Sequence, residues 1–327
     1  MPELRYLDAL NRAHHEEMAR DERVVVLGED VGAKGGVFGV TAGLLDRFGE
    51  ERVIDTPLAE SAIVGCAIGM AVNGLRPIAE IQFADFLHPA FDQIVSEAAR
   101  MRYRSNGAFG CPLVIRVPYG GAHGTALYHS QCVEAFYAHV PGLKVVVPST
   151  PYDAKGMLKA AVRDPDPVLF LEHKRLYRTV RGEVPEEDYE VPIGPAVVRR
   201  PGRHLSVFTY GWMLHETLRA AEMVRPEGIE VEVVELRTLR PLDKVTVLRS
   251  VAKTNKALVV YEDNRFCGYG AEIAALIAEE AFEDLDGPVM RLGGPDVPAV
   301  PFARSLEEAW MPDADRIAQA IRRLARY

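Results

Sequence analysis

The stretch VIDTPLAESAIVGCAIGMAVNG, from Val53 to Gly74, decides the fold class that the sequence predicts. It opens with a short strand-like segment and continues with small and apolar residues over the length of a helix. No residue between Ala62 and Val72 is charged, so we expect this helix to be deeply buried. A buried strand followed directly by a buried helix is typical of a parallel sheet covered by helices.

The same alternation continues on both sides of this stretch. Short β-branched runs predict further strands at 23–30, 76–83, 111–118, 143–148 and 167–172. Helices are expected at 4–20, 43–49, 89–103 and 152–162. Strands that alternate with helices predict an α/β fold with a doubly wound, mostly parallel sheet.

A second unit follows a break in this pattern. Residues 174–203 are rich in charge, proline and glycine, without a clear period. Strand-like runs then return at 204–211, 229–236, 256–263 and 287–294, with helices expected at 213–225, 242–253, 270–284 and 313–325. We therefore predict a domain over 1–180, a linker over 181–203 and a smaller α/β domain over 204–327.

Composition excludes several classes of function. The 327 residues carry a net charge of −9, which argues against a nucleic-acid or anionic-membrane surface as the main partner. No apolar run reaches the roughly 20 residues that span a bilayer. The charged N-terminus does not resemble a secretory signal, and the 4 cysteines form no CxxC pair. A cytoplasmic protein with reduced, mostly buried thiols is expected.

Polar residues at strand ends are the first candidates for a site, because ligands of parallel sheets bind there. Glu29 and Gln82 each follow a predicted strand. Glu60 stands at the start of the apolar helix, where Thr56 is expected to cap and Pro57 to begin the helix. In that position Glu60 has one of two roles. Either the helix dipole merely stabilises its negative charge, or its carboxylate shares a proton with a bound ligand.

The loop PYGGAHGTALYHSQ, at 118–131, also follows a predicted strand. It holds His123 and His129 and no acidic or basic residue besides them. A histidine in such a loop is either structural or a proton donor and acceptor. No GxSxG elbow or HExxH motif is present, and CGYGAEI at 267–273 is an incomplete dinucleotide fingerprint.

Seven motifs in this order carry a family resemblance. They are VVVLGEDVG, RVIDTPLAESAIVGCAIGMA, AEIQFADF, FDQIVSEAARMRYRS, ALYHSQ, PGLKVVVPSTPYDAKGMLKAAVRDPDPVLFLE and EVVELRTLRPLD. Together they closely resemble the beta subunit of the 2-oxo acid dehydrogenase decarboxylase component. The resemblance implies a transketolase-like fold with a thiamine pyrimidine-binding domain and a transketolase C-terminal domain. It also implies thiamine diphosphate, an alpha subunit in an α2β2 heterotetramer, and a lipoyl acyltransferase core.

The resemblance assigns roles to particular residues. Glu60 matches the glutamate that hydrogen-bonds the aminopyrimidine ring, and Phe86 matches the aromatic residue that stacks on that ring. His129 matches the histidine near the substrate and the lipoyl group, where it transfers protons during reductive acylation. Residues implied to line the pocket are Gln82, Leu58 and Glu29. Backbone carbonyls implied to hold potassium are those of Leu113, Ala161 and Asp164.

One motif of the wider superfamily is absent. The chain contains no GDG sequence, which holds magnesium and diphosphate in such enzymes. The alpha subunit is therefore expected to supply that half of the site, and this chain is expected to be inactive alone. The substrate is expected to be a branched-chain 2-oxo acid such as 2-oxoisovalerate, with pyruvate as the alternative. A split transketolase-like enzyme acting on sugar phosphates and a non-catalytic scaffold remain as less favoured readings.

Overall fold

The computed structural model describes residues 1–121 and 124–327, and these form two compact units. The first unit comprises 1–119 and 136–193, and the second comprises 120–135 and 194–327. The candidate histidine His123 lies outside the described residues. None of the described helices is long and apolar enough to cross a membrane.

The first unit is built on a parallel sheet with the strand order β6-β7-β5-β4-β2-β3. Its strands are β2 (Val24–Gly28), β3 (Val53–Asp55), β4 (Arg76–Glu80), β5 (Val114–Tyr119), β6 (Lys144–Val146) and β7 (Val168–His173). A short antiparallel pair, β1 (Glu3–Arg5) with β8 (Arg181–Glu183), lies apart from this sheet. Strands β2, β5 and β7 are buried along their whole length, as their apolar sequences predict.

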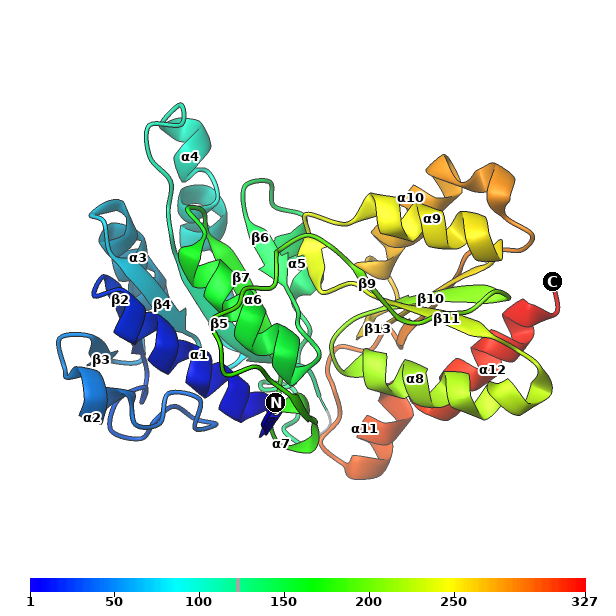
Figure 1. Ribbon diagram of the computed structural model, residues 1–327, viewed down its shortest axis with the longest axis horizontal. Coiled ribbons are helices and arrows are strands. Elements are labelled where there is room, and N and C mark those ends of the chain that lie inside the picture. The colour runs from blue at the N-terminus through cyan, green and yellow to red at the C-terminus, as the bar shows by residue number, and fades with distance from the viewer. Residues whose placement is uncertain (122–123) are drawn as a thin grey trace. The chain divides into compact units, whose positions relative to one another are not determined.

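Helices cover the sheet of the first unit (Figure 1). They are α1 (Tyr6–Arg20), α2 (Leu44–Phe48), α3 (Glu60–Val72), α4 (Met101–Arg104), α6 (Pro151–Arg163) and α7 (Leu176–Thr179), with the 3-10 turn η1 (Ala84–Ala90) and the π-helical turn η2 (Gln93–Ala98). Helix α1 packs against α6, whereas α3 packs against β4 and η1. The start of α6 is fixed locally, because Thr150 Oγ1 accepts a hydrogen bond from the Asp153 amide and Pro151 fills the first turn.

Helix α3 is less deeply buried in this chain than its composition predicts. Its residues Ala62, Cys66, Gly69 and Val72 are exposed along one face. The opposite face, with Ile63, Val64 and Ala67, is buried. The expectation of buried thiols is likewise only half right, since Cys66 and Cys267 are exposed while Cys111 and Cys132 are buried.

The second unit has a five-stranded sheet in the order β14-β13-β10-β11-β9. Its strands are β9 (Val197–Arg200), β10 (Leu205–Thr209), β11 (Val231–Glu235), β13 (Ala257–Asn264) and β14 (Met290–Gly294), and β12 (Thr238–Arg240) follows β11 in the chain. Only β9 among the sheet's strands runs antiparallel to its neighbour. The predicted linker 181–203 thus contains two strands, β8 and β9.

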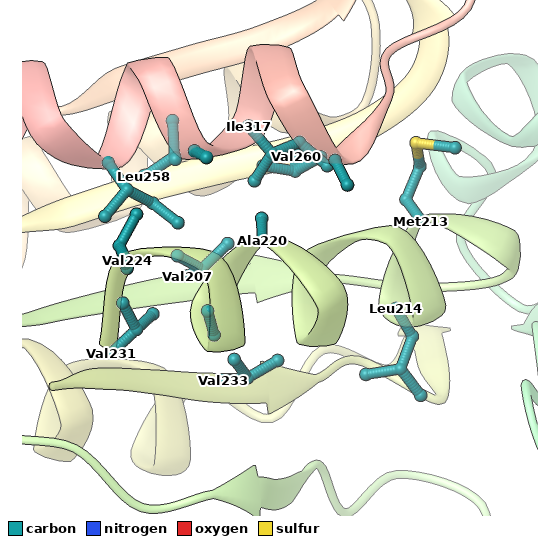
Figure 2. Close-up of a cluster of buried hydrophobic side chains, with 14 of the residues drawn as sticks. Val207, Met213, Leu214, Ala220, Val224, Val231, Val233, Leu258, Val260 and Ile317 are labelled. Carbon is teal, nitrogen blue, oxygen red and sulfur yellow. The ribbon is translucent and has the colours of Figure 1, made fainter. Parts of the chain in front are cut away.

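The core of the second unit lies between its sheet and two helices, α8 and α12. The helices of the second unit are α8 (Trp212–Val224), α9 (Lys244–Thr254), α10 (Gly270–Glu280), α11 (Arg304–Trp310) and α12 (Ala314–Ala325), with the turns η3 (Arg225–Glu227) and η4 (Phe282–Asp284). Helix α5 (Glu134–Ala138) begins where the chain leaves this unit. Figure 2 shows Val207 and Val260 from the strands beside Ala220 of α8 and Ile317 of α12. These side chains are completely buried.

Candidate functional site

Three neighbouring strands of the first unit end at the same level. Gly28 of β2 is paired in register with Asp55 of β3 and with Glu80 of β4. The chain continues from β2 to β3 on one side and then to β4 on the other, so the strand order reverses here. Ligands of open parallel sheets bind at such a reversal. The predicted residues that follow these strand ends are Glu29, Leu58, Glu60, Gln82 and Phe86.

Glu60 is the first residue of α3, and Ala59 is its N-cap without a capping side chain. The expectation that Thr56 caps the helix and Pro57 begins it is therefore wrong. Ala59 has an extended φ of −163°, and its carbonyl accepts the first hydrogen bonds of the helix from the amides of residues 62 and 63. Glu60 thus occupies the first turn, where the helix dipole favours a negative charge.

The Glu60 carboxylate has no donor in the described part of the chain. The residue is only 8% exposed, yet no described side chain or amide gives it a hydrogen bond or an ion pair. Nearby in the chain, the buried Thr56 Oγ1 also has no hydrogen-bond partner among the described residues. Buried polar groups without partners are costly. The Glu60 oxygens are not among these fully buried atoms, so they remain accessible to a ligand that donates a hydrogen bond.

Glu29 lies within electrostatic reach of Glu60. Burial raises the pKa of the Glu29 carboxyl, and the negative charges of Glu60 and Asp30 raise it further. Gln82 joins the same group, because its Nε2 donates a long hydrogen bond of 3.5 Å to the Glu29 carbonyl. The structure therefore brings Glu29, Glu60 and Gln82 together at one end of the sheet.

Phe86 is carried on η1, which packs directly against α3. Ser61, the neighbour of Glu60, donates a hydrogen bond to the carbonyl of Pro89 in the same turn. The Phe86 ring meets Phe83 edge-on, with centroids 5.9 Å apart. These contacts place η1, which carries Phe86, beside the start of α3. Leu58 precedes Glu60 by two residues, and its side chain is 77% exposed.

The glycine-rich loop 29–43 lies beside this group and is fixed by residues that sequence reasoning did not single out. The amide of Gly32 donates to Asp55 Oδ1 at 2.7 Å. Gly36 has a φ of +80°, and a Cβ there would lie 3.1 Å from Glu80 Oε1, so only glycine suits this position. Glu80 thus lies close to the loop that begins with Glu29.

Glu80 belongs to a buried ion-pair network that the sequence reading also missed. The network consists of Glu80, Arg116, Glu172 and Tyr177. Burial opposes the charge of Arg116, but Glu172 and Glu80 together hold the pKa of its guanidinium above the ordinary value. A detectable signal existed, since Arg116 is a charged residue inside an otherwise uncharged strand, and Glu80 ends the neighbouring strand β4 with a second charge.

His129 belongs to the second unit, on the segment 120–135. Its side chain is half-buried, and the residues around it form no helix or strand. The other site residues implied by the resemblance lie in the first unit. The described residues contain no cluster of three or more His, Cys, Asp or Glu side chains arranged to hold a metal ion.

The three carbonyls implied to hold potassium are already hydrogen-bonded within the first unit. Leu113 O accepts from the Val168 amide, and Ala161 O accepts from the Asp164 amide. Asp164 O accepts from Arg76 Nη1 at 3.2 Å. The Asp164 carboxylate also binds Lys144. The positive charge of Lys144 is thus balanced by this carboxylate, and the potassium site stays a prediction.

Comparisons with known proteins agree with this architecture. The chain matches the family models "Transketolase, pyrimidine binding domain" over residues 3–180 and "Transketolase, C-terminal domain" over residues 194–317. It is 57% identical over 327 residues to the 2-oxoisovalerate dehydrogenase subunit beta of Bacillus subtilis, covering 100% of both chains. It is 50% identical over 320 residues to the pyruvate dehydrogenase E1 component subunit beta of Acholeplasma laidlawii, covering 98% of this chain and 97% of the relative.

A solved structure supports the fold. It is described as "Split gene transketolase, inactive beta4 tetramer" and superposes with a TM-score of 0.80 at 24% sequence identity. The match covers 99% of this chain and 98% of that one. The expected transketolase-like fold is therefore confirmed.

Proposed function

The chain belongs to the family of 2-oxo acid dehydrogenase beta subunits, and from this premise we propose that it supplies half of a thiamine diphosphate site for oxidative decarboxylation. The single observation that carries the proposal is the Glu60 carboxylate, which lies at the start of α3 beside Glu29 and has no hydrogen bond or ion pair among the described residues. An aminopyrimidine ring whose nitrogen shares a proton with that carboxylate would satisfy it.

The residues gathered around Glu60 fit the pyrimidine end of this cofactor. When bound, thiamine diphosphate supplies the carbon nucleophile and the electron sink for decarboxylation. Glu60 holds a proton at the ring nitrogen, and Phe86 offers a flat apolar surface on which the ring can stack. Gln82, Leu58 and Glu29 are assigned to the surroundings of the same ring, which they would orient.

The diphosphate end needs a second polypeptide. The chain has no GDG motif to hold magnesium and diphosphate. We therefore assign these groups to an alpha subunit, in an α2β2 heterotetramer that closes the site. The chain alone has no catalytic activity under this proposal.

The second half of the reaction passes the acyl group to a lipoyl domain of an acyltransferase core. His129 is assigned to proton transfer in this reductive acylation. Neutral imidazole accepts and donates protons near physiological pH, which suits that work. The assignment rests on the family resemblance of the ALYHSQ motif.

A branched-chain 2-oxo acid, such as 2-oxoisovalerate, is the proposed substrate. The identity to the 2-oxoisovalerate dehydrogenase subunit is 57%, against 50% to a pyruvate dehydrogenase subunit. Pyruvate is the second candidate, because that difference is small and both relatives match along the whole chain.

The test is to reconstitute the heterotetramer with its alpha subunit and compare it with this chain alone. We expect tight binding of thiamine diphosphate with magnesium, and decarboxylation, only in the heterotetramer. Full binding and turnover by the isolated chain would overturn the split site. In the heterotetramer, a kcat/KM at least tenfold higher for 2-oxoisovalerate than for pyruvate is expected; the opposite ratio would establish pyruvate.

A further inference from the structure

Two buried carboxylates of the second unit hold the backbone of the loop that carries His129. Glu262 Oε1 accepts a hydrogen bond from the Gly121 amide at 2.5 Å. Both oxygens of Glu307 accept from the Gly124 amide, at 3.3 and 3.2 Å. The loop is thus fastened from the end of β13 and from α11, which are far apart in sequence.

Both carboxylates are withdrawn from solvent and converge on one glycine. Glu262 is 3% exposed and Glu307 is 6% exposed. A Cβ added to Gly121 would lie 3.5 Å from Glu262 Oε1 and 3.6 Å from Glu307 Oε1. Because buried carboxylates need donors, the loop amides and the two acids stabilise each other through charge-assisted hydrogen bonds.

The anchored amides are connected to His129 through Thr125. Thr125 directly follows Gly124, and its Oγ1 donates a hydrogen bond of 3.0 Å to the His129 carbonyl. Thr125 Oγ1 also pairs with Ser130 Oγ at 2.8 Å. The hydrogen bond from Thr125 therefore links His129 to the residue next to Gly124, the glycine that Glu307 binds.

The far side of His129 is tied to the same anchor. The Cys132 thiol hydrogen-bonds to Glu262, and burial raises the pKa of that thiol well above its ordinary value. The thiol therefore stays protonated and able to donate. Glu262 thus contacts the chain both before and after His129, at positions 121 and 132.

We propose that Glu307 and Glu262 are positioning residues for His129, and that they set the geometry of acyl transfer to the lipoyl group. The inference rests on the function proposed above for His129. Neither acid acts on the substrate itself; each acts through the backbone of the loop. Loss of an anchor should therefore slow the step that uses His129 more than the decarboxylation step that precedes it.

Three variants on one helix separate anchoring from general damage. Glu307→Ala removes the acceptor for Gly124, whereas Glu307→Gln keeps an oxygen at the same position. Glu308→Ala is the matched control, since Glu308 is the next residue on α11, is exposed and pairs only with the exposed Arg304 among the ion pairs of the described chain.

Each variant is assayed in the reconstituted heterotetramer in two ways. Decarboxylation is followed with an artificial electron acceptor, and reductive acylation is followed on a lipoyl domain. We expect Glu307→Ala to lose acylation by about tenfold to a hundredfold while decarboxylation changes by less than about threefold. Glu307→Gln should recover most of the acylation rate. Equal loss of both rates, or a glutamine variant as poor as the alanine variant, would overturn the proposal.

A second measurement does not depend on activity. Amide hydrogen exchange in peptides covering 124–132 of the purified chain should speed up by about tenfold or more in Glu307→Ala and stay unchanged in Glu308→Ala. Unchanged exchange in Glu307→Ala overturns the anchoring whatever the enzyme does. If exchange rises but the wild-type heterotetramer acylates no lipoyl domain, the anchoring stands and the proposed function of His129 fails.

Discussion

Arg116 donates two parallel hydrogen bonds to Glu172, from Nε to Oε1 and from Nη2 to Oε2, each 2.6 Å long. Its remaining nitrogen, Nη1, donates to Glu80 Oε2 at 2.6 Å. The Tyr177 hydroxyl donates to Glu172 Oε2. One guanidinium therefore joins β4, β5 and β7. Glu80, the last residue of β4, precedes Gln82 by two residues in the chain.

Arg116→Met should destabilise the chain strongly. The side chains of Arg116, Glu172 and Glu80 are 0%, 0% and 5% exposed, so the substitution leaves two buried carboxylates without their cation. We expect a loss of about 3–5 kcal/mol in the free energy of unfolding, measured by urea denaturation. Arg104→Met, which breaks the exposed pair with Glu97, should cost about 0–1 kcal/mol. Equal losses in both variants would contradict this account.

Glu60→Gln should abolish decarboxylation without disturbing assembly. The amide cannot hold the shared proton, so kcat in the reconstituted heterotetramer should fall by about a hundredfold or more. Size-exclusion chromatography should still show the intact heterotetramer. Glu51→Gln, an exposed glutamate before β3, is the control and should behave as the wild type. Undiminished turnover in Glu60→Gln would favour a scaffold role for the chain.

Phe86→Ala should weaken cofactor binding more than it slows the bound enzyme. Loss of the stacking ring is expected to raise the concentration of thiamine diphosphate needed for half-maximal activity by about tenfold. Phe86→Tyr keeps the ring and should stay within about threefold of the wild type. Titration of the apo-heterotetramer with cofactor makes this comparison. An alanine variant with unchanged cofactor affinity would show that the ring does not contact the cofactor.

Glu134 should make the stability of the second unit depend on pH. Glu134 is 0% exposed, and the Tyr210 hydroxyl donates a hydrogen bond to Glu134 Oε1 at 2.9 Å. Its other oxygen has no partner among the described residues. Burial, followed by the negative charge of Asp263, raises the pKa of Glu134 to about 8. Burial likewise raises the pKa of Asp263 to about 6.

The sign follows from proton binding. Both carboxyls bind protons more tightly in the folded chain than in the unfolded chain, so the stability that protonation provides is lost as pH rises through about 6 and about 8. Urea midpoints of the wild type should therefore fall as pH rises from about 4, near the ordinary carboxyl pKa, to about 8. Glu134→Gln, which can still accept from Tyr210, should fall less, whereas the exposed-residue variant Glu279→Gln should match the wild type. Identical slopes in all three would refute the assignment.

Local sequence patterns predicted helices and strands well where the neighbouring residues alone determine the backbone conformation. The strand predicted at 23–30 became β2 over Val24–Gly28, and the predicted helix at 152–162 became α6 over Pro151–Arg163. The predicted helix at 89–103 is broken instead into η1, η2 and α4, with Pro89 inside η1. Proline cannot donate a backbone hydrogen bond, and its ring crowds the preceding turn.

Features that depend on distant parts of the chain could not be read from local sequence. Glu80 and Arg116 face each other because their strands pair in that register, which no local pattern fixes. The contacts that Glu262 and Glu307 make could likewise not be predicted, because they reach a loop more than a hundred residues earlier. The position of Glu60 before an apolar helix left two roles open and the family motif favoured one of them, while its lack of a donor required the structure.

The segment 120–135 leaves the first unit, joins the second and then returns. The polypeptide therefore passes between its two units at 119/120, 135/136 and 193/194. A gene cut at the apparent boundary near 193 would separate the segment 120–135 from the rest of its unit. The N-terminal product would carry this segment without its partners, and the C-terminal product would lack it. During synthesis, the ribosome releases this segment long before its partners Glu262 and Glu307 emerge. The hydrogen bonds that hold the segment can therefore form only after α11 has been made.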